Sequence, residues 1–243
     1  MRDYLLDLVE HTYDLGCIEL IKITGTDKET TIDGLATDKS VVLQAKFATP
    51  VADFIGTFGM PNLGKLKILL NLQEYKEDAQ ITVISQNRNG TDAPVGLHFE
   101  NKAGDFKNDY RFMVSEVVAE QLKQFKMKPV PWAVEFEPTV ASIQRLKMQA
   151  QANAETPNFM AKTENGDLKF FFGDHSTHAG DFVFQSGVSG KLTRPWLWPV
   201  SQFISIMNLT GDKTVRISDD GATKITVDSG VAVYDYILPA LSK

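Results

Sequence analysis

The sequence has 243 residues, of which 43% are hydrophobic and 10% aromatic, and its 31 acidic and 25 basic residues give a net charge of −6. The length exceeds the roughly 100–150 residues usual for one domain, so two domains are expected. The acidic balance disfavours simple charge-driven binding to DNA, the lack of any apolar run of about 18 residues excludes a membrane-spanning helix, and the single Cys17 excludes an internal disulfide.

The first half opens with a helix pattern. Leu5, Leu8 and Val9 recur at helical spacing, and Gly16 ends the pattern. Carboxylates line the opposite face, at Asp3, Asp7, Glu10 and Asp14. The same stretch lacks the basic and then apolar pattern of a signal region, so we expect a soluble, cytoplasmic protein.

Strand-like runs fill most of the remaining first half. Pro50 and Gly59 bracket one further predicted helix at 51–58. Asn89-Gly90 is a hairpin signal between two runs. The strand patterns occupy 17–24, 31–36, 40–48, 65–72, 79–86, 95–100 and 109–114.

The middle of the chain has the pattern of a linker. Pro129 and Pro131 remove backbone donors and bias the residue before each toward extended geometry. Residues 128–132 therefore fit neither a helix interior nor a central strand. We expect an amino-terminal domain at 1–116, a connector at 117–132 and a carboxy-terminal domain at 133–243.

Past the linker the order of elements repeats. One helix begins after Pro138 and another after Pro199. The first of them has an expected apolar face of Val140, Ile143, Leu146 and Ala150. The strand patterns occupy 158–163, 167–173, 181–186, 213–219, 222–229 and 231–238.

Each half thus has the order helix, strands, short helix, strands. This order predicts an α+β protein with two similar domains, in which helices pack on one face of β-sheets. Such sheets leave edge strands, and uncovered edges invite pairing with another chain. Head-to-tail association around a ring is one closed solution.

The linker and the segments after it carry a family resemblance. Residues 128–132, Lys-Pro-Val-Pro-Trp, precede Glu-Phe-Glu-Pro at 135–138 and the helix segment at 143–147. In this order the chain resembles DNA polymerase sliding clamps of T-even-type bacteriophages, relatives of the proliferating-cell nuclear antigen (PCNA) fold. Other segments also occur in the order expected for this family. They are the helix that begins at 4–8 and runs through Gly16 into residues 18–20, and the segments 53–56, 181–184 and 203–207.

The resemblance implies a DNA clamp fold and a non-enzymatic function without cofactor or membrane. Such clamps form a six-domain ring as a homotrimer, encircle duplex DNA, are loaded by an ATP-dependent clamp loader and tether the replicative DNA polymerase. If the chain is phage-encoded, the implied location is the host cell cytoplasm. A ring holds DNA by topology, so weak contacts to phosphates suffice and an acidic net charge is compatible with this function.

Helices line the hole in such clamps, which implies a set of DNA-facing residues. The set is Arg145, Gln149, Ser142, Lys147, Ser201, Ser205, Asn208 and Lys65. The acidic outer face of the first helix departs from the family pattern. Either that helix is tilted or shielded by Arg2, Lys65 and Lys67, or the second domain holds most of the DNA.

The family also implies a pocket beside the linker that takes a short apolar peptide of a partner. The candidates are Val117, Val118, Pro129, Val130, Trp132, Tyr236, Ile237 and Leu238. Each of them also fits an ordinary core position. The last three fit a closing strand, and Val117 and Val118 fit linker residues that cover a sheet.

Enzyme-like features are few, and the sequence has no phosphate-binding loop, nucleophile elbow or Cys-x-x-Cys motif. His175 and His178 could bind zinc or transfer protons, but a polar loop between glycines fits them as well. The segment 10–14, with Glu10, His11 and Asp14, could bind a metal or form a solvated helix face. The segment 196–198, with two tryptophans, could stack on bases or pack as core.

Three functions therefore compete. The first is a sliding clamp, the second is a β-rich viral structural or assembly protein, and the third is a metal-dependent hydrolase that uses His175 and His178. The resemblance favours the first.

Overall fold

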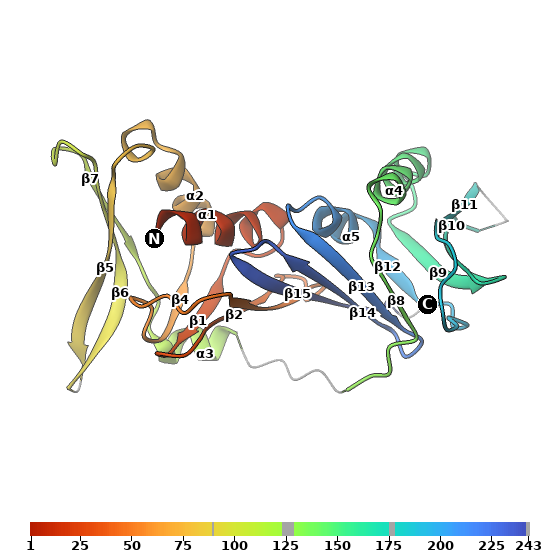
Figure 1. The fold of residues 1–243 in the computed structure, drawn as a ribbon, viewed down its shortest axis with the longest axis horizontal. Coiled ribbons are helices and arrows are strands. Elements are labelled where there is room, and N and C mark those ends of the chain that lie inside the picture. The colour runs from red at the N-terminus through yellow and green to blue at the C-terminus, as the bar shows by residue number, and fades with distance from the viewer. Residues whose placement is uncertain (89, 123–128, 175–177, 242–243) are drawn as a thin grey trace. The chain divides into compact units, whose positions relative to one another are not determined.

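The computed structural model describes residues 1–243 except 89, 123–128, 175–177 and 242–243 (Figure 1). The chain forms two compact units. The first comprises Met1–Phe125 and Ser229–Tyr234, and the second comprises Lys126–Asp228 and Asp235–Lys243. None of the helices in the described ranges has the length and apolar character that a bilayer crossing requires.

The first unit contains two antiparallel sheets with helices. Its helices are α1 (Arg2–Glu10), η1 (Tyr13–Leu15), α2 (Leu63–Asn71), η2 (Gln73–Tyr75) and α3 (Ser115–Gln121). Its strands are β1 (Ile21–Gly25), β2 (Thr30–Leu35), β3 (Val42–Phe47), β4 (Gly56–Met60), β5 (Gln80–Arg88), β6 (Thr91–Glu100) and β7 (Lys107–Arg111). The strand orders are β4-β1-β2-β3 and β5-β6-β7.

The far end of the chain also contributes to the first unit. Strand β15 (Ala232–Pro239) neighbours β3, and its first three residues belong to this unit. Just before β15, the Val231 carbonyl accepts a hydrogen bond of 2.9 Å from the Ala48 amide. The third strand of the first sheet is therefore paired on both sides.

The second unit is built in the same way. Its helices are α4 (Val140–Ala152) and α5 (Val200–Met207). Its strands are β8 (Val134–Phe136), β9 (Asn158–Glu164), β10 (Asp167–Gly173), β11 (Ala179–Gln185), β12 (Leu197–Pro199), β13 (Asp212–Ser218), β14 (Ala222–Asp228) and the rest of β15. The strand orders are β11-β10-β9-β12 and β15-β14-β13-β8.

The two units repeat one topology. The order β4-β1-β2-β3 corresponds strand by strand to β12-β9-β10-β11, and β5-β6-β7 corresponds to β13-β14-β15. Helix α1 packs against α2 and α4 packs against α5. The predicted α+β class and the predicted repeat of the two halves are confirmed.

One helix and one strand of the first unit were predicted wrongly. Residues 51–58 do not form a helix, because they turn and enter β4, with Gly56 at a positive φ of 98°. Residues 65–72 do not form a strand, because Leu63, Leu66 and Leu70 recur at helical spacing and form the buried face of α2. The leucine-rich composition hid this period.

The start of the predicted connector is helical. Helix α3 covers residues 115–121, and Val118 packs on Gly59, where a Cβ atom would lie 2.8 Å from Val118 Cγ2. Gly59 and Met113 exchange backbone hydrogen bonds of 2.9 and 2.8 Å next to this contact. Residues 123–128 of the connector, including Lys128 of the motif, lie outside the described residues, as does Asn89 of the predicted hairpin turn.

Candidate functional site: helix faces and strand edges

The predicted acidic face of the first helix divides between α1, which carries Asp3, Asp7 and Glu10, and η1, which carries Asp14. Asp7 accepts a hydrogen bond of 2.6 Å from the Tyr234 hydroxyl, and the His11 ring stacks on Tyr234 with centroids 4.4 Å apart. Lys67 Nζ lies 2.6 Å from an Asp14 oxygen. Two of the four carboxylates thus have partners on other elements, which supports shielding by Lys67.

The other two proposed shielding cations have different positions. Arg2 Nη2 donates to the Leu70 carbonyl at 2.8 Å, so Arg2 ties α1 to α2. Lys65 is exposed on α2, one turn from Ile68, which is also exposed. Lys65 is therefore accessible to solvent, and its DNA-facing role stays a prediction.

Helix α4 presents a neutral outer face. Thr139 caps the helix, because its Oγ1 accepts from the Ser142 amide at 3.1 Å, so Ser142 contributes to the cap. Leu146 is fully buried against the sheet. On the outer face Val140 is 76% exposed and Met148 is 61% exposed. Ala141, Gln144 and Gln151 are exposed as well.

The placement of Val140 on the buried face of this helix was wrong. Val140 is the first residue of α4, ahead of the turn that contacts the sheet. The sequence did contain the signal for the true outer face, since Val140, Gln144 and Met148 are spaced by four residues. That signal was missed because two of the three side chains are apolar.

Arg145 and Gln149 lie on the side of α4 that faces β11. Arg145 Nη1 donates to the Val183 carbonyl at 3.2 Å, and its guanidinium lies 5.4 Å from the centroid of the Phe182 ring. Gln149 lies against Gly180. Arg145 is exposed, but it does not point directly away from the sheet as predicted, and Lys147 is half-buried.

Helix α5 buries Phe203, Ile206 and Met207. The three predicted polar residues of this helix share one side, with Ser201 and Asn208 exposed and Ser205 half-buried. This row carries no charged side chain.

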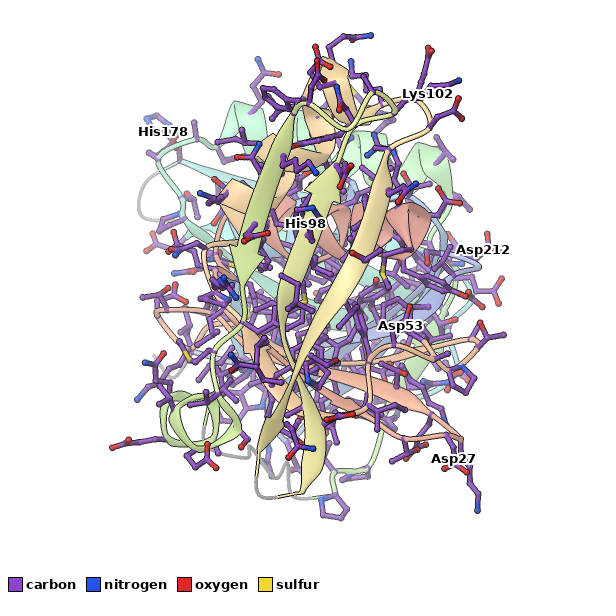
Figure 2. All side chains as sticks on the ribbon, turned by 90° about the vertical axis from the view of Figure 1, so that its left-hand side faces the viewer. Asp27, Asp53, His98, Lys102, His178 and Asp212 are labelled. Atoms are coloured by element: carbon purple, nitrogen blue, oxygen red, sulfur yellow. The ribbon has the colours of Figure 1, made fainter. Side chains whose placement is uncertain are left out.

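The β7 edge of the first unit carries an ion-pair network. His98 Nδ1 lies 2.8 Å from Asp109 and its Nε2 lies 3.4 Å from Glu100, on the sheet face turned to the viewer in Figure 2. Lys107 lies 3.2 Å from Glu100, and Arg111 lies 3.5 Å from Asp109. The hydrogen bond to Asp109 raises the pKa of His98, and the hydrogen bond from Lys107 lowers the pKa of Glu100.

The architecture of the chain is similar to that of solved structures. The chain is similar to the A. fulgidus PCNA of the structure "C-terminal region of FEN-1 bound to A. fulgidus PCNA", with TM-score 0.69, 9% identity, and coverage of 98% of this chain and 96% of that chain. It is also similar to PCNA from Thermococcus kodakaraensis, with TM-score 0.68, 9% identity, and coverage of 99% and 97%. This chain has the PCNA fold. No protein-family model matches the sequence, and no curated protein sequence matches it.

Within this PCNA fold, half of the eight residues of the predicted peptide pocket are core residues. Tyr236 and Leu238 are fully buried, Ile237 is 5% exposed, and Val118 is fully buried. These four side chains fit the core interpretation. The other candidates are accessible to different degrees: Val117 and Pro129 are exposed, and Val130 and Trp132 are half-buried.

Among the enzyme-like features of the sequence, the tryptophan segment 196–198 has a structural role. No group of three or more potential ligands within the described residues is arranged to hold a metal. His175 lies outside these residues, and His178 is exposed just before β11. Trp198 is 1% exposed, and Trp196 donates from Nε1 to the Asp219 carbonyl at 2.8 Å, so this segment packs as part of the fold.

Cys17 is half-buried. Burial and the nearby charge of Asp38 raise the pKa of its thiol to about 11. The thiolate is therefore scarce at neutral pH, which disfavours a nucleophilic role.

Proposed function

We propose that this protein is a DNA sliding clamp, in which three copies form a six-domain ring around duplex DNA. One observation carries the proposal: the PCNA fold spans nearly the whole chain, with both repeats present. Encirclement keeps the clamp on DNA without high affinity, which suits a protein with a net charge of −6. The protein acts as a non-enzymatic processivity factor and needs no cofactor.

The ring closes by strand pairing between copies. Within the first unit, β3 pairs with the start of β15. The equivalents of these strands in the other repeats are β11 and β7, which stand at sheet edges in the described chain. Pairing of β11 in one copy with β7 in the next repeats the β3–β15 arrangement and covers both edges.

The DNA faces the outer sides of α4 and α5 with neutral polar side chains. Gln144, Ser201 and Asn208 offer weak hydrogen bonds to phosphates without fixing a register, which permits sliding. Lys65 adds a cation from α2, and Arg145, Gln149, Ser142, Lys147 and Ser205 complete the DNA-facing set. The pairing of Asp14 with Lys67 reduces the repulsion that α1 exerts on phosphates.

The partners are a replicative DNA polymerase and an ATP-dependent clamp loader, of the kind used by T-even-type bacteriophages. A short apolar peptide of the polymerase docks beside the connector. The exposed Pro129, with Trp132, provides the apolar contacts, while Tyr236, Ile237 and Leu238 of the same unit support the site from the core. The solved A. fulgidus PCNA holds a C-terminal region of FEN-1, which is a precedent for such binding.

Two measurements test the clamp. Light scattering should give three times the chain mass of 27.0 kDa, and assemblies far larger than a trimer would favour a viral structural protein instead. With the cognate polymerase and its loader, the protein should lengthen the primer-extension products on DNA with blocked ends. It should lengthen them less on open linear DNA, because a ring slides off the free ends. Equal extension on both templates would contradict encirclement.

A double variant that adds negative charge tests the DNA-facing surface. Gln144→Glu combined with Ser205→Glu places carboxylates on the neutral faces of α4 and α5, so it should shorten primer extension. The matched control is Ala119→Glu with Gln121→Glu, which adds the same two negative charges at exposed positions of a different helix, α3. Equal extension by the variant and the wild type would remove these helix faces from the DNA site.

A further inference from the structure

The edge strand β11 is covered by a polar row of α4. Arg145, Gln149 and Asn153 follow each other at intervals of four residues, so they lie in one line along the helix flank. Arg145 reaches the Val183 carbonyl at 3.2 Å. Asn153, 6% exposed, donates to the Gln149 carbonyl at 2.8 Å and anchors the end of the row.

Gly180 on β11 makes this close approach feasible. A Cβ atom at Gly180 would lie 2.0 Å from Gln149 Nε2 and 3.0 Å from Asn153 Nδ2. The absence of a side chain thus lets the helix flank lie directly on the strand. The row contacts β11 at both ends, through Gly180 and through Val183.

The corresponding part of the first repeat is built differently. There β3 pairs with the start of β15, and α1 contributes Tyr4, whose ring meets Phe47 edge-on with centroids 5.3 Å apart. The contact of α1 with β3 is aromatic where the contact of α4 with β11 is polar. A hydrogen bond from a guanidinium to a strand carbonyl can be exchanged for a backbone hydrogen bond, whereas an aromatic contact stays in place when the strand is paired.

We propose that Arg145 is a latch on the β11 edge, which holds the Val183 carbonyl in the free subunit and releases it when β7 of a second copy pairs with β11. The proposal rests on the proposed clamp function. Edge strands are aggregation hazards, and a charged side chain over the edge is a common protection. The latch therefore makes pairing selective, because an incoming strand must replace the Arg145 hydrogen bond with its own.

The β7 strand of a second copy fits this edge. It is the topological equivalent of β15, the strand that pairs with β3. Its exposed Lys107, Asp109 and Arg111 together carry a net charge of +1, opposite in sign to the exposed Asp181 of β11. Cross-strand pairs of opposite charge favour this pairing over an encounter of two β11 edges.

Removal of the guanidinium tests the latch. Arg145→Ala should lower the dissociation constant between subunits by about tenfold, since no charge-assisted hydrogen bond has to be broken. Lys147→Ala is the matched control, because it removes the same charge from the same helix, and it should leave the constant within about twofold. Sedimentation equilibrium measures both, and an Arg145→Ala dissociation constant equal to or above that of Lys147→Ala overturns the latch.

Two additions keep the test decisive. Arg145→Lys keeps the charge and the aliphatic stem but loses the guanidinium, so it should tighten association less than Arg145→Ala does. Melting curves of both variants verify that they are folded. If the wild type stays monomeric at every concentration, the proposed ring fails, and a peptide with the sequence of residues 105–113 then tests the latch alone. Binding of this peptide to Arg145→Ala about tenfold tighter than to Lys147→Ala supports the latch, and equal binding overturns it.

Discussion

The two repeats share one topology, but they differ in the chemistry that surrounds their third strand. In the first repeat β3 is paired with the start of β15, and α1 is anchored to β15 by Asp7, His11 and Tyr234. In the second repeat β11 stands at the sheet edge under the polar row of α4. Strand β3, which is paired within the chain, thus lies in the repeat with the buried aromatic anchor. Strand β11, which stands at a sheet edge, is instead contacted by polar side chains of α4.

The outer faces of the helices differ in the same way. Helix α1 and the following η1 carry carboxylates, of which Asp7 and Asp14 have partners within the first unit and Asp3 is exposed. Helices α4 and α5 instead present neutral side chains such as Gln144 and Asn208. Under the proposed function, we therefore expect the helix faces of the second repeat to repel phosphates less than the acidic face of the first.

The largest expected effect comes from the anchor of α1. His11 is 1% exposed and stacks on Tyr234, so His11→Ala should leave a cavity and lower the free energy of unfolding by about 3 kcal/mol. The equivalent polar position in the second repeat is the control: Gln149→Ala should cost less than about 1 kcal/mol, because Gln149 is half-exposed. Urea unfolding measures both, and equal losses would show that the two helices are anchored alike.

A smaller loss should follow when the anchor keeps its ring and loses one hydrogen bond. Tyr234→Phe removes the hydroxyl that donates to Asp7 at 2.6 Å, which leaves a part-buried carboxylate short of a donor. We expect a decrease in unfolding free energy of about 2 kcal/mol. Tyr4→Phe is the matched control, since its hydroxyl meets Thr49 at an exposed site, and it should cost about 0.5 kcal/mol or less. A Tyr234→Phe variant as stable as Tyr4→Phe would rule out the anchor.

The Lys67–Asp14 pair should contribute less again. Both side chains are partly exposed, at 42% and 33%, so solvent screens their attraction. A double-mutant cycle with Lys67→Met and Asp14→Asn should give a coupling of about 0.5 kcal/mol that decreases at high salt. A coupling near zero at low salt would mean that Lys67 does not neutralise the negative charge of Asp14.

The sequence predicted the repeat because its signals are local and periodic. Asn165-Gly166 joins β9 to β10 at a positive φ for both residues, as its hairpin signal indicates, and Pro199 directly precedes α5. The α2 helix was missed because four buried leucines in a nine-residue helix fit a strand pattern equally well.

The site was harder to predict, because its roles depend on contacts between distant segments. Arg145 and Val183 are 38 residues apart, so no helix pattern reveals that this guanidinium lies on an edge strand. Tyr236 and Leu238 were candidates for the peptide pocket, but residues 236–238 are buried on both faces of β15, which a single strand pattern does not disclose. The polar residues of α5 share one side of the helix because their positions follow from helical spacing alone, and their contact with DNA stays a prediction.

The smallest expected effect distinguishes the two edges, β7 and β11, by pH. Because the hydrogen bond to Asp109 raises the pKa of His98, its titration midpoint followed by NMR should lie above the ordinary value of about 6.5. The charged form is favoured in the folded state, so this stabilisation is fully present below about pH 6.5 and is lost as the pH rises through the raised pKa. Asp109→Asn should lower the midpoint, whereas Asp78→Asn, which removes an equal charge beside Lys102, should leave it unchanged. If Asp109→Asn has no effect on the midpoint, the hydrogen bond between His98 and Asp109 does not organise the β7 edge.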